Sequence, residues 1–398
     1  MSFKALVISE VFPPQTGGSG KWLWEIYKRQ PVGNFVMAVG DSLAAGEEEL
    51  SYPHAIHRID LSMKFRGIRS LDSLAAYTRQ FRSLGKLVRA ENVTVVHAAR
   101  PLSEGLVAWA LKQRYGIPYL CYVHGEDVAV ATTSRELKLV TRPVLKGATK
   151  LIANSHFTAG MLRDEWGIDP QRVQVMHPGV DTSCFRPREI DEAGSRWPGR
   201  FVLLTVGRLQ QRKGHDTVIR ALPELLIKFP NLLYVIAGNG EERQRLQALA
   251  EQLGVLQQVE FLGEISDAAL LDCFQQCDVF VLANREVGRD AEGFGIVLLE
   301  AQACGKPVIA GDSGGTRDTL RPSETGYLVD CQSCEALVNL LTGPMSDKAH
   351  RVEMGKLGRK HVVDNFDWAS LAVEARRHFA AARDLPSERS KTTMGNNK

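Results

Sequence analysis

The chain has 398 residues, of which 44% are hydrophobic and 24% are charged, close to the averages of globular proteins. This composition excludes a disordered, collagen-like or coiled-coil chain, and the length predicts two domains. Lys and Arg number 49 against 46 Asp and Glu, a net charge of +3, which is too balanced for a protein whose whole surface binds nucleic acid.

The sequence predicts a cytoplasmic protein without membrane helices or bound metal. No apolar stretch approaches the about 18–20 residues that a membrane helix needs, and the apolar run in MSFKALVISEVFPP is too short for a signal peptide. Seven cysteines, an odd number, favour free thiols in a reducing compartment. Cys331 and Cys334 have the spacing of a redox or zinc pair, but no second pair completes a metal site.

Short apolar runs bounded by Gly, Pro or Asn recur along the chain and predict strands with helices between them. In the first half these runs are 4–9, 34–39, 94–97, 118–123, 150–154 and 172–176. The second series comprises 201–206, 232–237, 259–262, 278–283, 307–310 and 326–329. Because most of these runs are apolar throughout, they fit parallel sheets covered on both faces, and we expect an α/β protein with two doubly wound domains.

The segment from Phe185 to Gly199 is rich in charge, Pro and Gly, and we interpret it as the linker between the domains. The predicted domains are therefore 1–187 and 198–369. An amphipathic helix at about 370–385 has no strand after it, and we expect it to pack back on the first domain. The polar tail 386–398 is expected to be disordered.

A glycine-rich loop, PPQTGGSGKW, follows the first predicted strand, and its residues Gly17, Gly18 and Gly20 resemble a phosphate-binding turn. The loop is not a P-loop, because Gln15 stands where the first glycine belongs. It is not a dinucleotide fingerprint either, because Leu23 replaces the third glycine. Both a tight turn before a helix and a close approach of the backbone to a bulky ligand remain open.

In the second half, VGRLQQRKG follows a strand and places Arg208 and Lys213 in one loop. Ligands of open α/β sheets bind at the carboxyl ends of strands, so two cations there suit a diphosphate. The most specific motif is EGFGIVLLE, in which Glu292 and Glu300 flank the start of a helix near Phe294. Free amides at a helix start bind anionic oxygen, and the two carboxylates can accept hydrogen bonds from the hydroxyls of a polyol. A sugar attached to a diphosphate has this arrangement of charge.

These motifs resemble those of the retaining GT-B glycosyltransferases of family 4. The resemblance covers nearly the whole chain and includes the glycine-rich first loop, YVHGEDV, IANSHFTAGML, HPGVDTSCFRP, VGRLQQRKG, IAGNGEE and the E-x7-E block. The sequence of the stretch RDAEGFGIVLLEAQACGKPVIAGDSGG is most similar to that of mannosyltransferases that act on phosphatidylinositol mannosides. The resemblance implies the GT-B fold, two Rossmann-like domains with a cleft between them.

The resemblance also implies roles for individual residues. Arg208 and Lys213 would bind the donor diphosphate, with Gly17 and Gly18 against the donor from the other domain. Glu292 would contact the hydroxyls of the donor sugar and act in catalysis. Glu300 would hold the ribose. Backbone amides at the helix start would contact sugar and phosphate, namely those of Phe294, Gly295, Ile296 and Val297.

His124, at the end of an apolar strand, corresponds to the active-site histidine of the family, which lies near the donor sugar. We therefore expect a catalytic role for His124, although a structural one stays open. Asn154 and Ser155 match a loop that the family places at the cleft, and packing explains them equally well.

The implied reaction transfers a hexose of mannose or glucose type from GDP or UDP to an alcohol, with retention of configuration. Neither cleft motif offers a carboxylate placed as a nucleophile, so a two-step glycosidase-like route is not supported. In the family the departing phosphate takes the acceptor proton, and the protein orients the reactants and stabilises charge. No Asp-x-Asp metal motif is apparent, and we expect no cofactor besides the nucleotide sugar.

We expect a lipid-linked or glycan acceptor on the first domain. Residues 1–190 carry 24 Lys or Arg against 18 Asp or Glu, and we assign this positive charge to the acceptor side. Residues 58–89 contain eight Lys or Arg and two acids, interleaved with apolar side chains. This pattern fits either contact with anionic lipid headgroups on the inner face of the membrane or a solvated helix over the core. Two further alternatives remain, namely a nucleotide-sugar epimerase or hydrolase of the same architecture, and a UDP-hexose-dependent transferase to a small-molecule acceptor.

Overall fold

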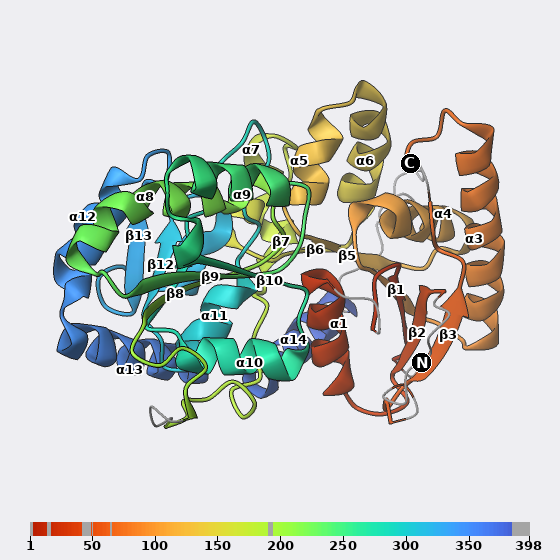
Figure 1. Cartoon of the computed structure of the whole chain (residues 1–398). Coiled ribbons are helices and arrows are strands. Elements are labelled where there is room, and N and C mark those ends of the chain that lie inside the picture. The colour runs from red at the N-terminus through yellow and green to blue at the C-terminus, as the bar shows by residue number, and fades with distance from the viewer. Residues whose placement is uncertain are drawn as a thin grey trace, which may run out of the picture. The chain divides into compact units, whose positions relative to one another are not determined.

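The computed structural model describes residues 3–13, 17–41, 49, 51–63, 66–189 and 194–383. The chain divides into two compact units, Met1–His177 with Ala369–Lys398, and Pro178–Trp368. Each unit contains one parallel sheet with helices on its faces (Figure 1). The predicted tail 386–398, residues 190–193 of the predicted linker, and Lys64 and Phe65 of the basic segment lie outside the described residues.

The first unit is built on a seven-stranded sheet in the order β3-β2-β1-β4-β5-β6-β7. Its strands are β1 (Ala5–Ser9), β2 (Phe35–Gly40), β3 (Ala55–Ile59), β4 (Val95–Ala98), β5 (Tyr119–Val123), β6 (Lys150–Ala153) and β7 (Val173–Val175). Its helices are α1 (Gly18–Lys28), α3 (Leu71–Ala90), α4 (Leu106–Tyr115), α5 (Glu126–Thr132), α6 (Arg135–Gly147), α7 (His156–Asp164) and α14 (Trp368–Arg383), with short helical turns at Pro101–Gly105 and Pro170–Arg172. All adjacent strands pair in parallel.

Helix α14 belongs to the first unit, although the second unit precedes it in the chain. The ring of Phe379 stacks on Tyr27 of α1 with centroids 5.4 Å apart and lies 4.8 Å from the ring of His97 on β4. The backbone carbonyl of Ala372 accepts a hydrogen bond of 3.0 Å from the side chain of Gln30. Both α1 and α14 thus cover one face of the sheet, while α3, α4 and α6 contribute to the core on the other face.

The second unit has a six-stranded parallel sheet in the order β10-β9-β8-β11-β12-β13. Its strands are β8 (Phe201–Val206), β9 (Leu232–Ala237), β10 (Val259–Gly263), β11 (Val279–Leu282), β12 (Val308–Gly311) and β13 (Gly326–Val329). Its helices are α8 (His215–Lys228), α9 (Arg243–Gln252), α10 (Asp267–Gln276), α11 (Ile296–Ala303), α12 (Glu335–Thr342) and α13 (Lys348–Asn365), with short helical turns at Gln211–Lys213, Leu256–Gln258, Gly314–Thr319 and Pro344–Ser346.

Helices cover both faces of this second sheet. Figure 1 shows α8, α9 and α12 on one face and α10, α11 and α13 on the other. Alternate residues of β8 enter the two cores, since Leu203 packs with the first group of helices and Val202 and Leu204 with the second. A sheet covered on both faces explains why its strands are apolar throughout, and the predicted doubly wound α/β class is confirmed.

The chain leaves the first unit at residue 177 and not at 187. Val180 lies in the second unit because its N–H donates to the carbonyl of Phe366 at 2.9 Å. Phe185 and Trp197, both within the predicted linker 185–199, are buried in the core of the second unit. The indole N–H of Trp197 donates to Glu260 at 2.7 Å. The described parts of this polar segment are therefore anchored in the second unit by two aromatic side chains.

Candidate active site

The second unit carries most of the predicted donor-binding residues on two loops. The loop after β8 holds Arg208 and Lys213, and the loop after β11 holds Glu292. Strands β8 and β11 are neighbours at the point where the strand order of the sheet reverses. In open α/β sheets, ligands bind at the carboxyl ends of the strands at such a point. The fold thus places both loops where a ligand site is expected.

A compact cluster of ion pairs joins these two loops. One carboxylate oxygen of Glu292, Oε2, accepts hydrogen bonds from Lys213 Nζ at 2.5 Å and from Arg212 NH1 at 2.7 Å. The Nε atom of Arg212 lies 3.1 Å from Oδ1 of Asp290. The side chains of Glu292, Lys213 and Arg212 are only 11%, 11% and 8% exposed. The sequence predicts that Lys213 and Glu292 belong to one donor-binding site, and in the structure their side chains are in direct contact.

The charge state of Glu292 follows from two opposing effects. Burial raises the pKa of this carboxyl, but the nearby charges of Lys213 and Arg212 and their hydrogen bonds outweigh burial, so the pKa lies below its ordinary value. Glu292 is therefore ionised at neutral pH. Lys213 and Arg212 both bind Oε2 of Glu292. The other carboxylate oxygen, Oε1, can therefore accept a hydrogen bond from a ligand hydroxyl.

Glycines let the backbone segments around Glu292 approach closely. Gly214, the residue after Lys213, has φ +69°, and a Cβ there would overlap the carbonyl oxygen of Ala283 at the end of β11. A Cβ on Gly314, which has φ +66°, would overlap the carbonyl oxygen of Glu292 itself. The N–H of Gly315 donates to that same carbonyl at 2.8 Å. The backbone of Glu292 is thus held by the Gly314–Gly315 segment, and the Lys213 loop packs at Gly214 against the end of β11, in both places with no room for a side chain.

Helix α11 begins directly after this loop, as the sequence predicts. Gly295 precedes it with φ +94°, and Ile296 and Val297 form its first turn with half-buried side chains. The side chain of Phe294 is 3% exposed and packs toward Phe366, so only its backbone amide is placed to contact a ligand. Free amides at this helix start can bind anionic oxygen.

Glu300, predicted to hold the ribose, lies in the second turn of α11 and is 5% exposed. Arg208 differs from its predicted partner Lys213 because its side chain is exposed. Among the described residues, no ion pair to Arg208 is found. Its carbonyl oxygen accepts a hydrogen bond of 3.4 Å from His215 Nε2, which anchors the loop backbone and leaves the guanidinium in solvent.

The remaining predicted residues lie in the first unit. His124 follows β5 and is half-buried, with its ring edge-on to Trp22 at a centroid distance of 5.5 Å. Its Nε2 lies 2.8 Å from the carbonyl oxygen of Ala99. A carbonyl can only accept, so Nε2 carries the proton and Nδ1 is the acceptor of the neutral ring. Burial and, to a smaller extent, the charge of Arg100 lower the pKa of His124 to about 4, so the ring is neutral at pH 7.

Gly17 and Gly18 stand at the start of α1, and both are exposed. Gly17 is the N-cap residue, and its carbonyl accepts the N–H of Lys21 at 3.0 Å. The loop is therefore a turn into a helix, with its backbone accessible to a ligand. Asn154 and Ser155 have structural partners, since Asn154 donates to the carbonyl of His124 at 3.1 Å and the Ser155 hydroxyl caps α7.

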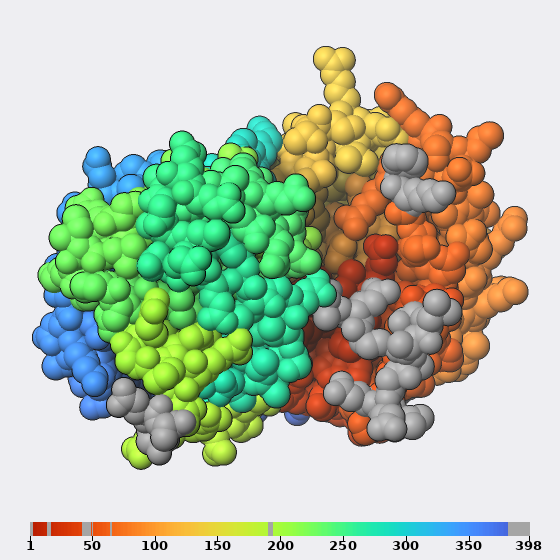
Figure 2. Space-filling model, viewed as in Figure 1, coloured from red at the N-terminus to blue at the C-terminus, as the bar shows by residue number. Residues whose placement is uncertain are grey.

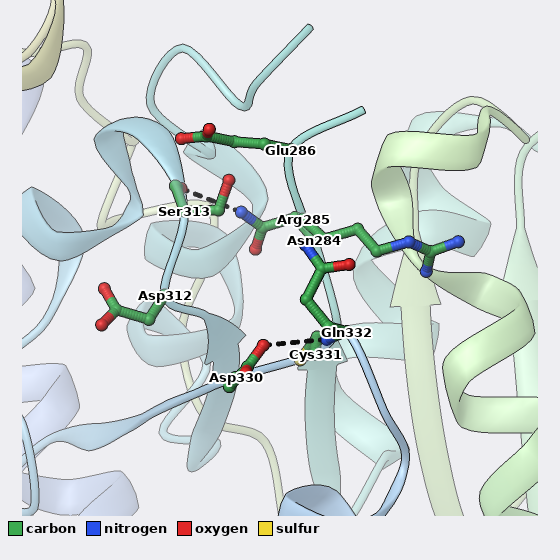
Figure 3. A pocket seen from close by; sticks show the side chains of 8 residues that line it. All are labelled: Asn284, Arg285, Glu286, Asp312, Ser313, Asp330, Cys331 and Gln332. Carbon is green, nitrogen blue, oxygen red and sulfur yellow. Dashed lines mark hydrogen bonds between the residues drawn. The ribbon is translucent and has the colours of Figure 1, made fainter. Parts of the chain in front are cut away.

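A polar pocket of about 280 Å³ lies in the second unit, beyond β11 along the same sheet edge (Figure 3). Its walls come from the ends of β11, β12 and β13, and its lining residues are Asn284, Arg285, Glu286, Asp312, Ser313, Asp330, Cys331 and Gln332. Two of its acids have partners, since Asp312 pairs with Arg317 and Asp330 accepts the N–H of Gln332 at 2.9 Å. Figure 3 shows Asn284 between these loops, with its amide donating to the carbonyl of Ser313.

Sequence reasoning missed Arg212, Asp290, Gly314 and Gly315. Arg212 directly precedes Lys213, and the side chains of adjacent residues usually point in different directions. The sequence therefore does not indicate that both side chains bind the same carboxylate. The two glycines were noted only as part of the motif AGDSGG, without a role. The close contact of these glycines with the backbone of Glu292 becomes visible only once β11 and β12 are side by side.

Comparison with known proteins identifies the family of the chain. A family model described as glycosyl transferases group 1 matches residues 187–361, and one described as glycosyltransferase family 4 matches residues 35–183. The GDP-mannose-dependent monoacylated alpha-(1-6)-phosphatidylinositol monomannoside mannosyltransferase of Corynebacterium glutamicum is 30% identical over 92% of this chain and 95% of its own length. A GDP-mannose-dependent alpha-(1-6)-phosphatidylinositol monomannoside mannosyltransferase of Mycobacterium tuberculosis is 29% identical over 93% of this chain and 96% of its own length.

Solved structures share the fold. Sucrose-phosphate synthase from Thermosynechococcus elongatus superposes with a TM-score of 0.79 over 95% of this chain and 100% of its own, at 23% identity. Anabaena HepE in complex with UDP and glucose gives a TM-score of 0.79 over 96% of this chain and 100% of its own, at 19% identity. The predicted GT-B fold and enzyme class are confirmed. The chain is a glycosyltransferase that belongs to family 4 of the GT-B glycosyltransferases.

Proposed function

We propose that this enzyme transfers a hexose, of mannose type, from a nucleoside-diphosphate sugar to an alcohol of a lipid-linked acceptor, with retention of configuration. The observation that carries the proposal is the cluster of Lys213, Arg212 and Glu292 beside the start of α11. The choice of mannose and of a lipid-linked acceptor rests on the names of the two mannosyltransferase relatives.

The groups at this site can bind both the diphosphate and the sugar of such a donor. Lys213 and the exposed Arg208 would neutralise the diphosphate, and the amides of Ile296 and Val297 would donate to its oxygens. The free oxygen of ionised Glu292 would accept a hydroxyl proton of the sugar. These groups stabilise the charge that develops on the leaving diphosphate. With this positive charge from the protein, the proposed reaction needs no metal.

The neutral ring of His124 would take part in binding the donor sugar, as the family resemblance implies. Its Nδ1 can accept a hydrogen bond from a sugar hydroxyl, because Nε2 is held by the carbonyl of Ala99. A neutral histidine does not repel the positive charge that builds up on the sugar ring in a glycosyl transition state. We therefore assign it to positioning and electrostatic support of the donor sugar and not to proton transfer.

A donor panel tests this function. The purified protein is incubated with GDP-mannose or UDP-glucose, with and without lipid extract, in buffer with EDTA. We expect transfer from GDP-mannose only when acceptor lipid is present, and an α-linked product by NMR. Release of nucleoside diphosphate or an altered sugar without acceptor would instead identify a hydrolase or an epimerase. Transfer from UDP-glucose to a small-molecule acceptor would reject the mannosyltransferase.

We further propose that the first unit contacts an anionic membrane surface from the cytoplasmic side through the outer face of α3 and the residues just before it. Leu71, Leu74 and Ile68 are 84%, 45% and 38% exposed. Exposed basic side chains accompany them, namely Arg66, Arg69, Arg79, Arg82, Lys86 and Arg89. Figure 2 shows orange side chains of the segment that contains α3 projecting from the surface. Exposed apolar and basic side chains together suit an interface of anionic headgroups.

Not all of the predicted segment 58–89 is available for this contact. Arg58 is half-buried and donates to the carbonyls of Gly40 at 2.7 Å and Pro13 at 2.6 Å. Tyr77 is buried, and Phe81 stacks on Tyr115 within the core. No described helix is both long and apolar enough to cross a membrane. Any membrane contact is therefore proposed only for the outer face of α3 and the residues just before it.

Vesicle flotation tests the membrane contact. We expect binding to vesicles with phosphatidylglycerol and none to pure phosphatidylcholine. Leu71→Ser should weaken binding, whereas the control Ile227→Ser, at an 83% exposed aliphatic residue of the second unit, should not. Equal flotation of the two variants would remove α3 from the proposal, and the donor panel would be unaffected by that result.

A further inference from the structure

We propose that Arg212 is a positioning residue that keeps Glu292 ionised and oriented while Lys213 turns to the donor diphosphate. The inference rests on the proposed function, in which Lys213 binds the diphosphate and Glu292 the sugar. It starts from an unusual contact, in which the single oxygen Oε2 of Glu292 serves two cations at 2.5 and 2.7 Å.

The two cations differ in how firmly they are held. Arg212 contacts two carboxylates with different nitrogens, since NH1 donates a hydrogen bond to Glu292 and Nε lies at an ion-pair distance of 3.1 Å from Asp290. Its own carbonyl accepts the N–H of Arg285 at 2.9 Å, and the side chain of Arg285 bonds Asp216 at 2.9 Å. The β8–α8 and β11–α11 loops are thus tied together at Arg212.

Lys213 has a flexible stem that ends in one point charge, so it can exchange partners at little cost. Lys213 and Arg212 together carry two positive charges, and Glu292 and Asp290 carry two negative ones, so the cluster at rest has no net charge to offer a diphosphate. Lys213 can attract a diphosphate only if its ammonium group leaves Glu292 or is shared between Glu292 and the diphosphate. Of the two cations, Lys213 is therefore the one that moves and Arg212 the one that stays.

The different behaviour of Lys213 and Arg212 is important because Glu292 is buried. Burial by itself raises the pKa of its carboxyl, and a protonated Glu292 would no longer accept a strong hydrogen bond from a sugar hydroxyl. The charged groups that face Glu292 are Lys213 and Arg212 from the β8–α8 loop, with Asp290 of its own loop bound behind Arg212. The segment Gly314–Thr319 faces it with the backbone of Gly314 and Gly315 and carries Arg317, paired on the surface with Asp312, and Asp318. Once Lys213 is engaged, Arg212 is the cation of the described part of the chain that stays in contact with Glu292.

The test measures protons taken up when nucleotide binds. Calorimetric titration of GDP and UDP at pH 5.5, in two buffers of different ionisation enthalpy, compares the parent with Arg212→Gln. In the variant, nucleotide binding should draw Lys213 away from Glu292, and Glu292 should then take up a proton. The number of protons taken up per nucleotide bound should exceed that of the parent by up to about one. Arg212→Lys keeps the charge and should reduce this extra uptake. If the glutamine variant does not fold, Arg212→Met, which also removes the charge, serves as the readout.

A buried arginine elsewhere in the same unit provides the matched control. Arg351 is 9% exposed and donates to the carbonyls of Met345 and Ser346, so Arg351→Gln perturbs the packing without touching Glu292. It should lower the melting temperature and leave proton uptake at the parent value. If uptake in Arg212→Gln equals that of the parent, or if Arg351→Gln changes uptake equally, the positioning role is wrong.

Turnover gives a second readout that a merely structural role would not move. A pH profile of kcat reports groups in the enzyme–donor complex, and one of kcat/KM reports the free enzyme. Arg212→Gln should shift the acid limb of kcat to higher pH by more than that of kcat/KM, because Lys213 leaves Glu292 only in the complex. Equal shifts would overturn the inference. A parent protein that binds neither GDP nor UDP would instead refute the proposed function itself.

Discussion

Glu292→Gln removes one negative charge from the ion cluster and leaves the shape of the side chain almost unchanged. In the native protein Glu292 pairs with Lys213 and Arg212, and all three side chains are at most 11% exposed. Removing one partner of a buried ion pair costs about 3–5 kcal/mol. The amide oxygen of Gln still accepts one hydrogen bond and Arg212 keeps Asp290, so we expect a loss near the lower end, about 3 kcal/mol of unfolding free energy.

The effect on activity should separate from the effect on donor binding. A hydrogen bond between a carboxylate and a sugar hydroxyl contributes about 1.5–3 kcal/mol, which corresponds to about 10- to 150-fold in kcat/KM. Lys213, in contrast, is released from Glu292 by the substitution. The affinity for a nucleoside diphosphate should therefore increase while turnover falls.

Steady-state transfer rates and calorimetric titration of GDP and UDP check this pair of outcomes. Glu260→Gln is a suitable control, since Glu260 lies in the same unit on the edge strand β10, two strands from β8, and accepts a hydrogen bond from Trp197. Near-normal transfer by Glu292→Gln would refute its contact with the sugar. A parallel loss of transfer and nucleotide affinity would show that Glu292 only maintains the structure of the loops.

The same substitution changes the dependence of stability on pH. The pKa of Glu292 in the folded protein lies below its ordinary value of 4.5, because two cations stabilise the ionised form. Its ionisation therefore adds stability above pH 4.5, and this contribution is lost as the pH falls through the lower pKa of the folded state. Urea unfolding between pH 3 and 7 should show a smaller loss at the acid end for Glu292→Gln than for the parent.

Three further outcomes follow from the geometry. Lys213→Ala removes a charge-assisted contact and should raise the Kd for nucleoside diphosphate by about 10- to 150-fold, measured by calorimetry, and an unchanged Kd would exclude Lys213 from the diphosphate site. Gly214→Ala should lower the melting temperature far more than Gly254→Ala, because both have φ near +70° but only the new Cβ at residue 214 meets the carbonyl of Ala283; equal losses would contradict this steric argument. His124 has a folded pKa of about 4 against an ordinary 6.5, so protonation disfavours folding and the parent should lose stability between pH 6.5 and 4. The advantage of the parent over His124→Asn in urea unfolding should shrink over that range, and a constant difference would mean that the pKa is not lowered.

The strand pattern was predictable because apolar runs are a local property of the chain. Among the described residues, all six strands of the second unit match predicted runs, and six of the seven strands of the first unit do. The exception is β3, with the sequence AIHRI. It lies at the edge of the sheet, where its residues are half-buried or exposed, so His57 and Arg58 interrupt the apolar pattern. Edge strands need fewer apolar residues because one side has no neighbouring strand.

The domain boundary could not be read from local composition. The segment 185–199 has the charge and proline content of a linker, but Phe185 and Trp197 are anchored in the core of the second unit. The chain instead changes units at His177 and again at Trp368, within sequence that looks ordinary. Which contacts a polar segment makes depends on residues distant in sequence, such as Phe274 for Phe185.

For the site, the sequence by itself determined which kinds of groups are present and at which strand ends they lie. Glycines, cations and carboxylates at the ends of apolar runs must gather at one edge of a parallel sheet, so Lys213 and Glu292 could be assigned to one site. Only the tertiary structure decided that Arg212 shares the same carboxylate oxygen, that Phe294 faces the core, and that Arg208 stays in solvent. The physical reason is that ion pairing and burial depend on distances of a few ångströms between loops that are about eighty residues apart in the chain, and no local pattern encodes such distances.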